Sequence, residues 1–298
     1  MRKLLAVILA TVLLGLSACG GGESMGVRHP QLGAEISRGA DGSGVLPEYA
    51  EVTEDMAAAA LYAVSDSFAL DKDEMLDTGM WLRQLVFGES KAYILRVELE
   101  KYSLMASTPY GIAPDGTMQS LRGQAAILAQ GGTAVVGGIG ANRINGADSA
   151  PIGAVVKNGT TLYNVKGNDG SVYFGLYEDG GAFACSYEEY GTIYRNKVTE
   201  LVSAPHLIVK DGVAVPVAGS VYQTPVCYTG AGFSADRQTV CFVYAENIEM
   251  ATLSSLLITS GCSVGVCFDY GEALGMLCGD GVFGNRASVG PALFAVRK

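Results

Sequence analysis

The sequence predicts an α+β fold: mixed β-sheets with a few interspersed helices, forming a single large domain. Forty glycines and a mean hydropathy of +0.27 indicate many tight turns between buried strands. Strand-like runs outnumber helix-like runs, and the helices are dispersed among the strands. Acidic residues outnumber basic ones by 30 to 20, which excludes nucleic acid binding through counterion release.

The first nineteen residues have the pattern of a bacterial lipoprotein leader. A basic start at residues 1–3 precedes an apolar run over residues 4–14, and Leu-Ser-Ala-Cys at residues 16–19 resembles a lipoprotein cleavage site. The apolar run would extend only about 16 Å as a helix, too short for a hydrocarbon core of roughly 30 Å. We therefore expect residues 1–18 to be a signal peptide and Cys19 to carry the lipid that anchors an exported protein to the bacterial cell envelope.

The rest of the chain divides by composition into three parts. Residues 19–47 are rich in glycine and have little apolar area, which predicts a flexible tether. Residues 48–90 contain helix formers and predict a helical N-terminal segment, and the β-rich residues 91–298 predict the main domain.

A helix and a strand open the folded part. Thr53 can cap a helix whose positive end suits Glu54 and Asp55, and residues 56–64 are strong helix formers. Residues 91–99 predict a strand because the run ends in alternating polar and apolar side chains.

Short elements follow up to the first glycine-rich loop. We expect a strand at residues 103–107 and a helix that Thr117 caps and that ends at Gln130. Residues 133–139 then form a short apolar strand flanked by glycines.

The middle and the end of the chain are rich in β-structure. Asn158-Gly159 and Asp211-Gly212 favour type I′ turns, so residues 152–165 and 208–217 predict two hairpins. The last part predicts strands and one helix, namely strands at residues 238–244, 263–268 and 292–296 and a helix at residues 250–260.

Cysteine usage leaves the redox state open. Six cysteines follow Cys19, which permits up to three disulfides in an exported protein. Alternatively they are small buried hydrophobes, as Cys241 and Cys267 inside apolar runs indicate. Cys262 and Cys267 lack a second close pair, and the chain has only two histidines, so we expect neither a metal nor another cofactor.

Two loops have the composition of ligand sites. The glycine- and amide-rich loop at residues 137–148 combines backbone freedom with short hydrogen-bonding side chains. The second loop, at residues 268–272, carries Asp269 and Glu272 where a buried strand ends. Each loop is also compatible with an ordinary polar turn. If both bind ligand, they should face each other across one pocket.

The order of these segments resembles the phosphodiester glycosidase family from about Tyr93 to Val296. The family's A-G-I-N-A-D-F-F loop is similar to residues 138–144, its Pro-x-Gly hairpin to residues 151–159 and its L-V-K-D-G hairpin to residues 207–212. Its remaining motifs resemble later segments in the same order: P-R-T-A-I-G is similar to residues 228–232, N-L-D-G-G-G-S-S-T-M to residues 267–276, and E-R-x-V-x-x-A-L to residues 285–293.

Several polar positions depart from the family pattern. The motif's Asn and Asp are replaced by Gly140 and Asn142, its Arg by Tyr228, and a Gly by Glu272. Loss of an arginine that could form a bidentate contact weakens the binding of a phosphodiester. The polar positions have changed, whereas the packing pattern remains.

The resemblance implies a site for sugar phosphodiesters or related surface glycans. It makes Asp269 the acid/base candidate, Glu272 a possible second carboxylate, and Asn142 a hydrogen-bond donor beside them. The resemblance also places substrate-binding groups around these residues, namely Gly140, Tyr228, and Arg143 or Arg286 opposite the phosphate.

Two classes of function remain open. One is a lipid-anchored glycan-binding or scaffolding protein that kept the fold and lost catalysis, and the other is an active glycoside hydrolase on sugar-1-phosphodiesters. A Ser-His-Asp hydrolase is disfavoured, because no G-x-S-x-G motif occurs and His206 lies beside a hairpin.

Overall fold

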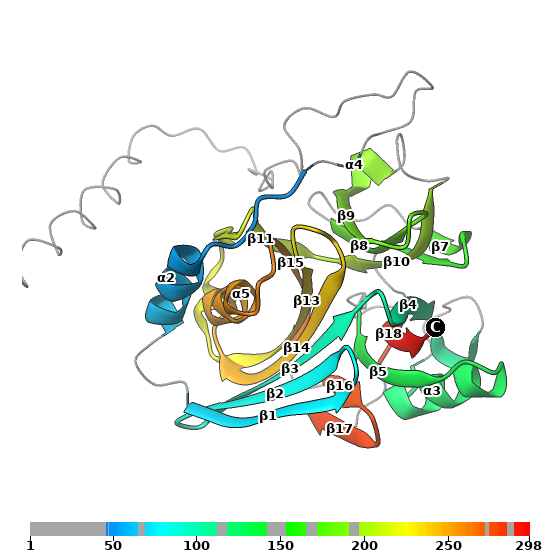
Figure 1. Cartoon of the computed structure of the whole chain (residues 1–298), viewed down its shortest axis with the longest axis horizontal. Coiled ribbons are helices and arrows are strands. Elements are labelled where there is room, and N and C mark those ends of the chain that lie inside the picture. Colours follow the sequence, from blue (N-terminus) through cyan, green and yellow to red (C-terminus); the bar gives the residue numbers. More distant parts are fainter. Residues whose placement is uncertain are drawn as a thin grey trace, which may run out of the picture.

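A computed structural model shows β-sheets stacked against one another and covered by helices (Figure 1). The described residues are 46, 48–64, 69–111, 118–141, 153–164, 172–190, 197–271, 274–284 and 289–298. They form one α+β domain, which confirms the predicted fold class.

The large sheet has eight strands in the described part of the chain, each antiparallel to its neighbours. In spatial order they are β1 (Ala69–Asp77), β2 (Met80–Phe87), β3 (Ser90–Glu98), β14 (Thr239–Ile248), β13 (Val226–Phe233), β15 (Val264–Gly271), β11 (His206–Lys210) and β12 (Val213–Ala214).

The N-terminal segment differs from the prediction for residues 48–90. Helix α2 (Glu54–Val64) forms after Thr53, whose hydroxyl accepts the Met56 N–H, as predicted. The strands β1 and β2 follow, however, so this segment is helical only in part. The charged β1 has mostly exposed side chains and lies at the edge of the sheet, where its hydrogen bonding to β2, and not burial, makes it a strand.

Two smaller sheets, each with five strands among the described residues, pack against the large one. The β8 sheet comprises β7 (Thr160–Asn164), β6 (Ala154–Lys157), β10 (Val198–Ala204), β8 (Val172–Tyr177) and β9 (Ala182–Ser186). The β5 sheet comprises β17 (Gly281–Gly284), β16 (Gly275–Cys278), β5 (Val135–Gly140), β18 (Ala292–Arg297) and β4 (Tyr102–Ser107).

The hairpin turns form as the sequence predicts. Asn158-Gly159 joins β6 to β7 with φ values of 49° and 72°, and Asp211-Gly212 joins β11 to β12 with φ values of 50° and 72°. Both residues of a type I′ turn need positive φ, which asparagine, aspartate and glycine tolerate. The second hairpin is shorter than predicted, because β12 ends at Ala214.

The helices cover the outer surfaces of the sheets. Figure 1 shows α5 (Met250–Thr259) in the curve of the large sheet, with α2 beside it. Helix α3 (Leu121–Gln130) packs on the β5 sheet, and its cap is Ser120, whose hydroxyl accepts the Gly123 N–H. The predicted cap Thr117 lies outside the described residues. The short helices are η1 (Pro109–Gly111), α4 (Tyr187–Glu189) and η3 (Ser220–Gln223).

The large sheet has two faces that differ in what covers them. The inner face packs on the smaller sheets through side chains such as Leu95, Phe242 and Phe268. The helix face packs on α5 through side chains such as Ile94 and Val243. Since successive strand residues point to opposite faces, the central strands supply both cores.

Candidate functional site

Asp269 lies near the end of β15 on the inner face of the large sheet. It pairs with Thr229 on β13, Thr229 pairs with Tyr244 on β14, and Tyr244 pairs with Tyr93 on β3. Directly opposite residues in a sheet share a face, so these four side chains form a continuous line across four strands. We call Asp269, Thr229, Tyr244 and Tyr93 the polar row.

The carboxylate end of the polar row is partly open. Asp269 is half-buried, and its Oδ1 accepts the Tyr270 N–H at 2.8 Å. Thr229 beside it is completely buried, yet no described residue hydrogen-bonds its hydroxyl. A buried hydroxyl without a partner costs free energy unless a water or a ligand satisfies it. The pair Asp269–Thr229 therefore has hydrogen-bonding capacity to offer a bound molecule.

Tyr244 connects the row to a second carboxylate. Its Oη donates to Glu246 Oε1 at 3.1 Å and lies 3.7 Å from Cys227 Sγ. Burial, reinforced by the contact with Cys227, raises the pKa of Tyr244 far above its usual value, so the phenol stays protonated. The half-buried Glu246 is thus held at the same end of the inner face as Asp269.

The β5 sheet closes over the other end of the row, at Tyr244 and Tyr93. Phe283 on β17 stacks on Tyr93 with ring centroids 4.3 Å apart. A Cβ on Gly284 would lie 2.6 Å from Tyr244 Cζ and 2.8 Å from its Oη. Glycine at position 284, with φ of 88°, is therefore required for the tyrosine to fit under β17.

Gly140 ends β5, where the first predicted ligand loop begins. It pairs with Ala292 on β18 and is buried. A Cβ at Gly140 would lie 3.1 Å from Val289, and one at Gly137 would lie 2.3 Å from Leu95. Close packing therefore explains these glycines, so glycine content alone does not mark a ligand loop here.

The other residues proposed from the sequence fall into two groups. Five lie outside the described residues, so their roles stay predictions: Cys19, Asn142, Arg143, Glu272 and Arg286. The proposed facing of Asn142 and Asp269 likewise stays a prediction. The described strands agree with it in one respect: β16 begins at Gly275, shortly after β15 ends, and pairs with β5.

Tyr228 lies on the opposite face from Asp269, which corrects its expected role as a substrate-binding residue. Its side chain is completely buried in the core around α5, with its ring centroid 6.1 Å from that of Tyr270. Burial raises the pKa of Tyr228 well above the usual range, and no described residue hydrogen-bonds its hydroxyl. His206 also lies on this face, where its Nε2 is 2.8 Å from Tyr222 Oη.

The sequence interpretation missed the partners of Asp269. Cys227 and Thr229 lie on β13, and Tyr244 and Glu246 on β14. These two strands precede β15 in the chain, and strand pairing brings them to Asp269. The available signal is alternation, because Tyr244 and Glu246 occupy every second position of an otherwise apolar strand. That pattern shows a shared face but not which neighbours it meets.

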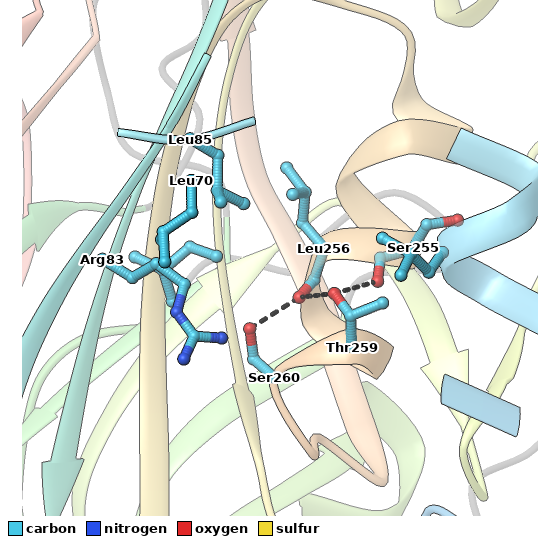
Figure 2. A pocket seen from close by; sticks show the side chains of 9 residues that line it. Leu70, Arg83, Leu85, Ser255, Leu256, Thr259 and Ser260 are labelled. Atoms are coloured by element: carbon cyan, nitrogen blue, oxygen red, sulfur yellow. Dashed lines mark hydrogen bonds between the residues drawn. The ribbon is translucent and has the colours of Figure 1, made fainter. Parts of the chain in front are cut away.

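A pocket of about 330 Å³ opens on the helix face, away from the polar row (Figure 2). Leucines from α2, β1, β2 and α5 form its walls, with Arg83 and hydroxyl side chains at one side. The hydroxyls of Thr259 and Ser260 both donate to the carbonyl of Leu256. Arg83 pairs with Asp73 at 2.7 Å. The pocket is therefore mainly apolar, and its polar groups already have partners.

The described ranges have neither a metal-binding cluster nor a helix that could span a membrane. Those ranges contain no cluster of three His, Cys, Asp or Glu side chains placed to hold a metal ion. Among the helices within them, none is long and apolar enough to cross a bilayer.

The sequence profile of the phosphodiester glycosidase family matches residues 129–293, more than half of the chain. This match includes β5, the polar row except Tyr93, and β17. Comparison with curated proteins finds no significant match.

Solved structures have a similar fold. A hypothetical protein from Synechocystis has 9% identity and a TM-score of 0.57, with 78% of this chain and 65% of that protein covered. The catalytic domain of zebrafish N-acetylglucosamine-1-phosphodiester alpha-N-acetylglucosaminidase, auto-inhibited by its pro-peptide, has 12% identity and a TM-score of 0.54, covering 84% and 87% of the two chains. At these identities the likeness shows a shared fold alone.

Proposed function

Since the chain belongs to the phosphodiester glycosidase family, we propose that it binds sugar phosphodiesters or related surface glycans at the polar row, with weakened catalysis. The observation that carries this proposal is Asp269 next to the buried Thr229 hydroxyl that no described residue satisfies. A sugar hydroxyl or a phosphate oxygen at this end of the inner face would supply the missing partner.

The chemistry of the row suits a glycan. Sugars offer many hydroxyls, which donate to carboxylates and accept from hydroxyl groups. Asp269 and Glu246 provide acceptors, and Thr229 provides a hydroxyl between them on the same face. Tyr93 and Phe283 add aromatic surface next to these polar groups. The row thus combines polar anchors with an apolar wall, as ligand sites do.

Cleavage of a glycosyl phosphodiester needs more than binding. A general acid or base must lie beside the scissile bond, and developing charge must be stabilised. Asp269 is our candidate for proton transfer, with Glu246 as the second carboxylate. The family's arginine is replaced by Tyr228, whose burial on the helix face leaves it unable to oppose a phosphate. This replacement supports weakened catalysis.

The proposal also includes a cellular location. The leader pattern at residues 1–19 supports export and a lipid anchor on Cys19 in the cell envelope. Labelled fatty acid should be incorporated into the natural chain and not into Cys19→Ser. Equal labelling of both forms would remove the lipid anchor from the proposal and leave the sugar site untouched.

The main test measures binding and turnover together. Titration calorimetry with an N-acetylglucosamine phosphodiester should give saturable binding, which Asp269→Asn weakens at least tenfold. Turnover of a chromogenic analogue should remain close to background. Asp280→Asn is the matched control, because it makes the same chemical change at an exposed turn between β16 and β17.

The outcomes separate the two candidate functions. Rapid turnover abolished by Asp269→Asn would replace weakened catalysis with an active glycoside hydrolase, the alternative that the two carboxylates favour. A loss of about a hundredfold or more is expected for removal of a general acid or base. Absence of both binding and turnover would overturn the proposed function.

A further inference from the structure

Two cysteines meet on the helix face, at the end of α5. Cys241 lies on β14, and Cys262 follows the turn that ends the helix. Their exposed fractions are 0% and 1%, and both belong to the core around α5. This pair lies on the face opposite the polar row and has no part in the proposed function.

A glycine brings the two thiols together. Gly232 on β13 is the direct cross-strand partner of Cys241. A Cβ on Gly232 would lie 2.8 Å from both the Cβ and the Sγ of Cys262. Cys262 therefore occupies the space that a side chain at position 232, directly opposite Cys241, would fill. The Sγ of Cys241 also lies 3.9 Å from the carbonyl oxygen of Ser260, two residues before Cys262, so both cysteines are at the same end of α5.

This arrangement is close to what a disulfide needs. Opposite positions in a sheet have Cβ atoms about 4.5–5.5 Å apart, and a disulfide needs about 3.5–4.5 Å between them. The thiols are free in the structure, but small side-chain rotations would bring the sulfurs to bonding distance.

We propose that Cys241 and Cys262 form a disulfide when the chain folds in an oxidising medium, tying the end of α5 to β14. With oxidised glutathione as the two-electron oxidant, one cysteine thiolate attacks the glutathione disulfide and releases one reduced glutathione. The second thiolate then attacks the mixed disulfide at the first cysteine. The protein loses two hydrogens, and a second reduced glutathione leaves.

The two cysteines differ in acidity in the folded chain. A hydrogen bond with Cys262 lowers the pKa of Cys241, whereas the same bond and burial raise the pKa of Cys262. Cys241 is thus the more readily ionised sulfur. Because both sulfurs are buried, glutathione reaches them during folding or opening of the core and not in the closed native state. Oxidation should therefore be rapid on refolding and slow for the folded, reduced chain.

The experiment compares the full chain refolded with oxidised or with reduced glutathione. Oxidative refolding should lower the intact mass by two hydrogens. Digestion after glutamate should then yield a linked pair of peptides, one containing Cys227 with Cys241 and the other Cys262 with Cys267, and fragment ions distinguish the cysteines within each peptide. Reduction should lower the melting temperature by roughly 5–10 °C.

Matched variants assign the bond. Cys267→Ala alters another buried cysteine of the same core and should keep the cross-link and the melting shift. Cys262→Ala should lose both. Alkylation of both thiols after oxidative refolding, or a link from Cys241 to Cys267, would overturn the proposal. The peptide map of the unaltered chain decides the question even where a variant fails to fold.

Discussion

Tyr228 and Thr229 are neighbours in the chain, yet they belong to two different chemical environments. Tyr228 lies in the apolar core under α5, whereas Thr229 lies in the polar row beside Asp269. The cause is the alternation of side chains along β13. One strand thus stabilises the helix with one set of residues and builds the candidate site with the other.

The hydroxyls of α5 and of the polar row differ in how they are satisfied. On the helix face, the hydroxyls of Ser254, Thr259 and Ser260 donate to carbonyls of their own helix. On the inner face, Thr229 has no such partner among the described residues. The 330 Å³ pocket lies on the helix face, so this cavity and the candidate chemistry are in different places. The candidate site is identified by a buried hydroxyl beside a carboxylate, and not by hollow volume.

The largest expected effect on stability comes from the helix face. Leu253 on α5 is fully buried and lies over Gly230, where a Cβ would be 3.2 Å from its Cδ2. Leu253→Ala leaves a cavity and should lower the free energy of unfolding by about 2–5 kcal/mol. Urea denaturation measures this loss. Glycan affinity per folded molecule should stay unchanged. A loss of affinity comparable to the loss of stability would show that the two faces are not independent.

A buried carboxylate between the two smaller sheets, that of Glu200 on β10, should impose a pH dependence on stability. This carboxylate is 4% exposed, and its oxygens accept the N–H groups of Ala106 and Asn158 at 2.7 and 2.8 Å, joining the β8 and β5 sheets. Burial raises its pKa from 4.5 to about 7, although the two N–H groups act in the opposite direction.

The raised pKa means that the folded state binds the Glu200 proton more tightly than the unfolded chain does. This contribution to stability is complete below about pH 4.5 and is lost as the pH rises through 7, amounting to about 3 kcal/mol. Unfolding measured between pH 4.5 and 8 should show this decline, and Glu200→Gln should flatten it. A difference between the two proteins that grows toward low pH in favour of the variant would contradict the assignment.

The neighbouring pair on β13 gives the sharpest comparison of the faces. Tyr228→Phe and Thr229→Val each remove a buried hydroxyl that no described residue satisfies, so each should raise stability by about 1 kcal/mol. Only Thr229→Val should weaken glycan binding, by about tenfold, equivalent to about 1.4 kcal/mol. Thermal unfolding and calorimetry test both changes. Equal loss of affinity in the two variants would place the site elsewhere.

The smallest effect is expected at the rim of the pocket. Arg83 and Asp73 form an ion pair with side chains that are 46% and 36% exposed, so solvent screens their attraction. Arg83→Gln should lower stability by less than about 1 kcal/mol and leave glycan binding unaltered. A tenfold loss of binding in this variant would move the candidate site to the helix face.

The sequence alone determined the local elements and indicated one candidate carboxylate. The turns at Asn158-Gly159 and Asp211-Gly212 and the helix after Thr53 form as predicted, because neighbouring residues in the chain decide them. Asp269 was singled out for the same reason: an acidic residue that ends a buried strand is visible in a short stretch of sequence.

Only the tertiary structure decided which side chains share a face and a neighbour. Strand pairing placed Thr229 beside Asp269 and Tyr244, turned Tyr228 under α5, and made β1 a strand through its hydrogen bonds to β2. It also gave the glycines of β5 a packing role, because contacts between layers join segments far apart in the chain, as where Gly137 lies against Leu95. Local sequence specifies alternation, but long-range pairing chooses the partners, and the candidate site consists of those partners.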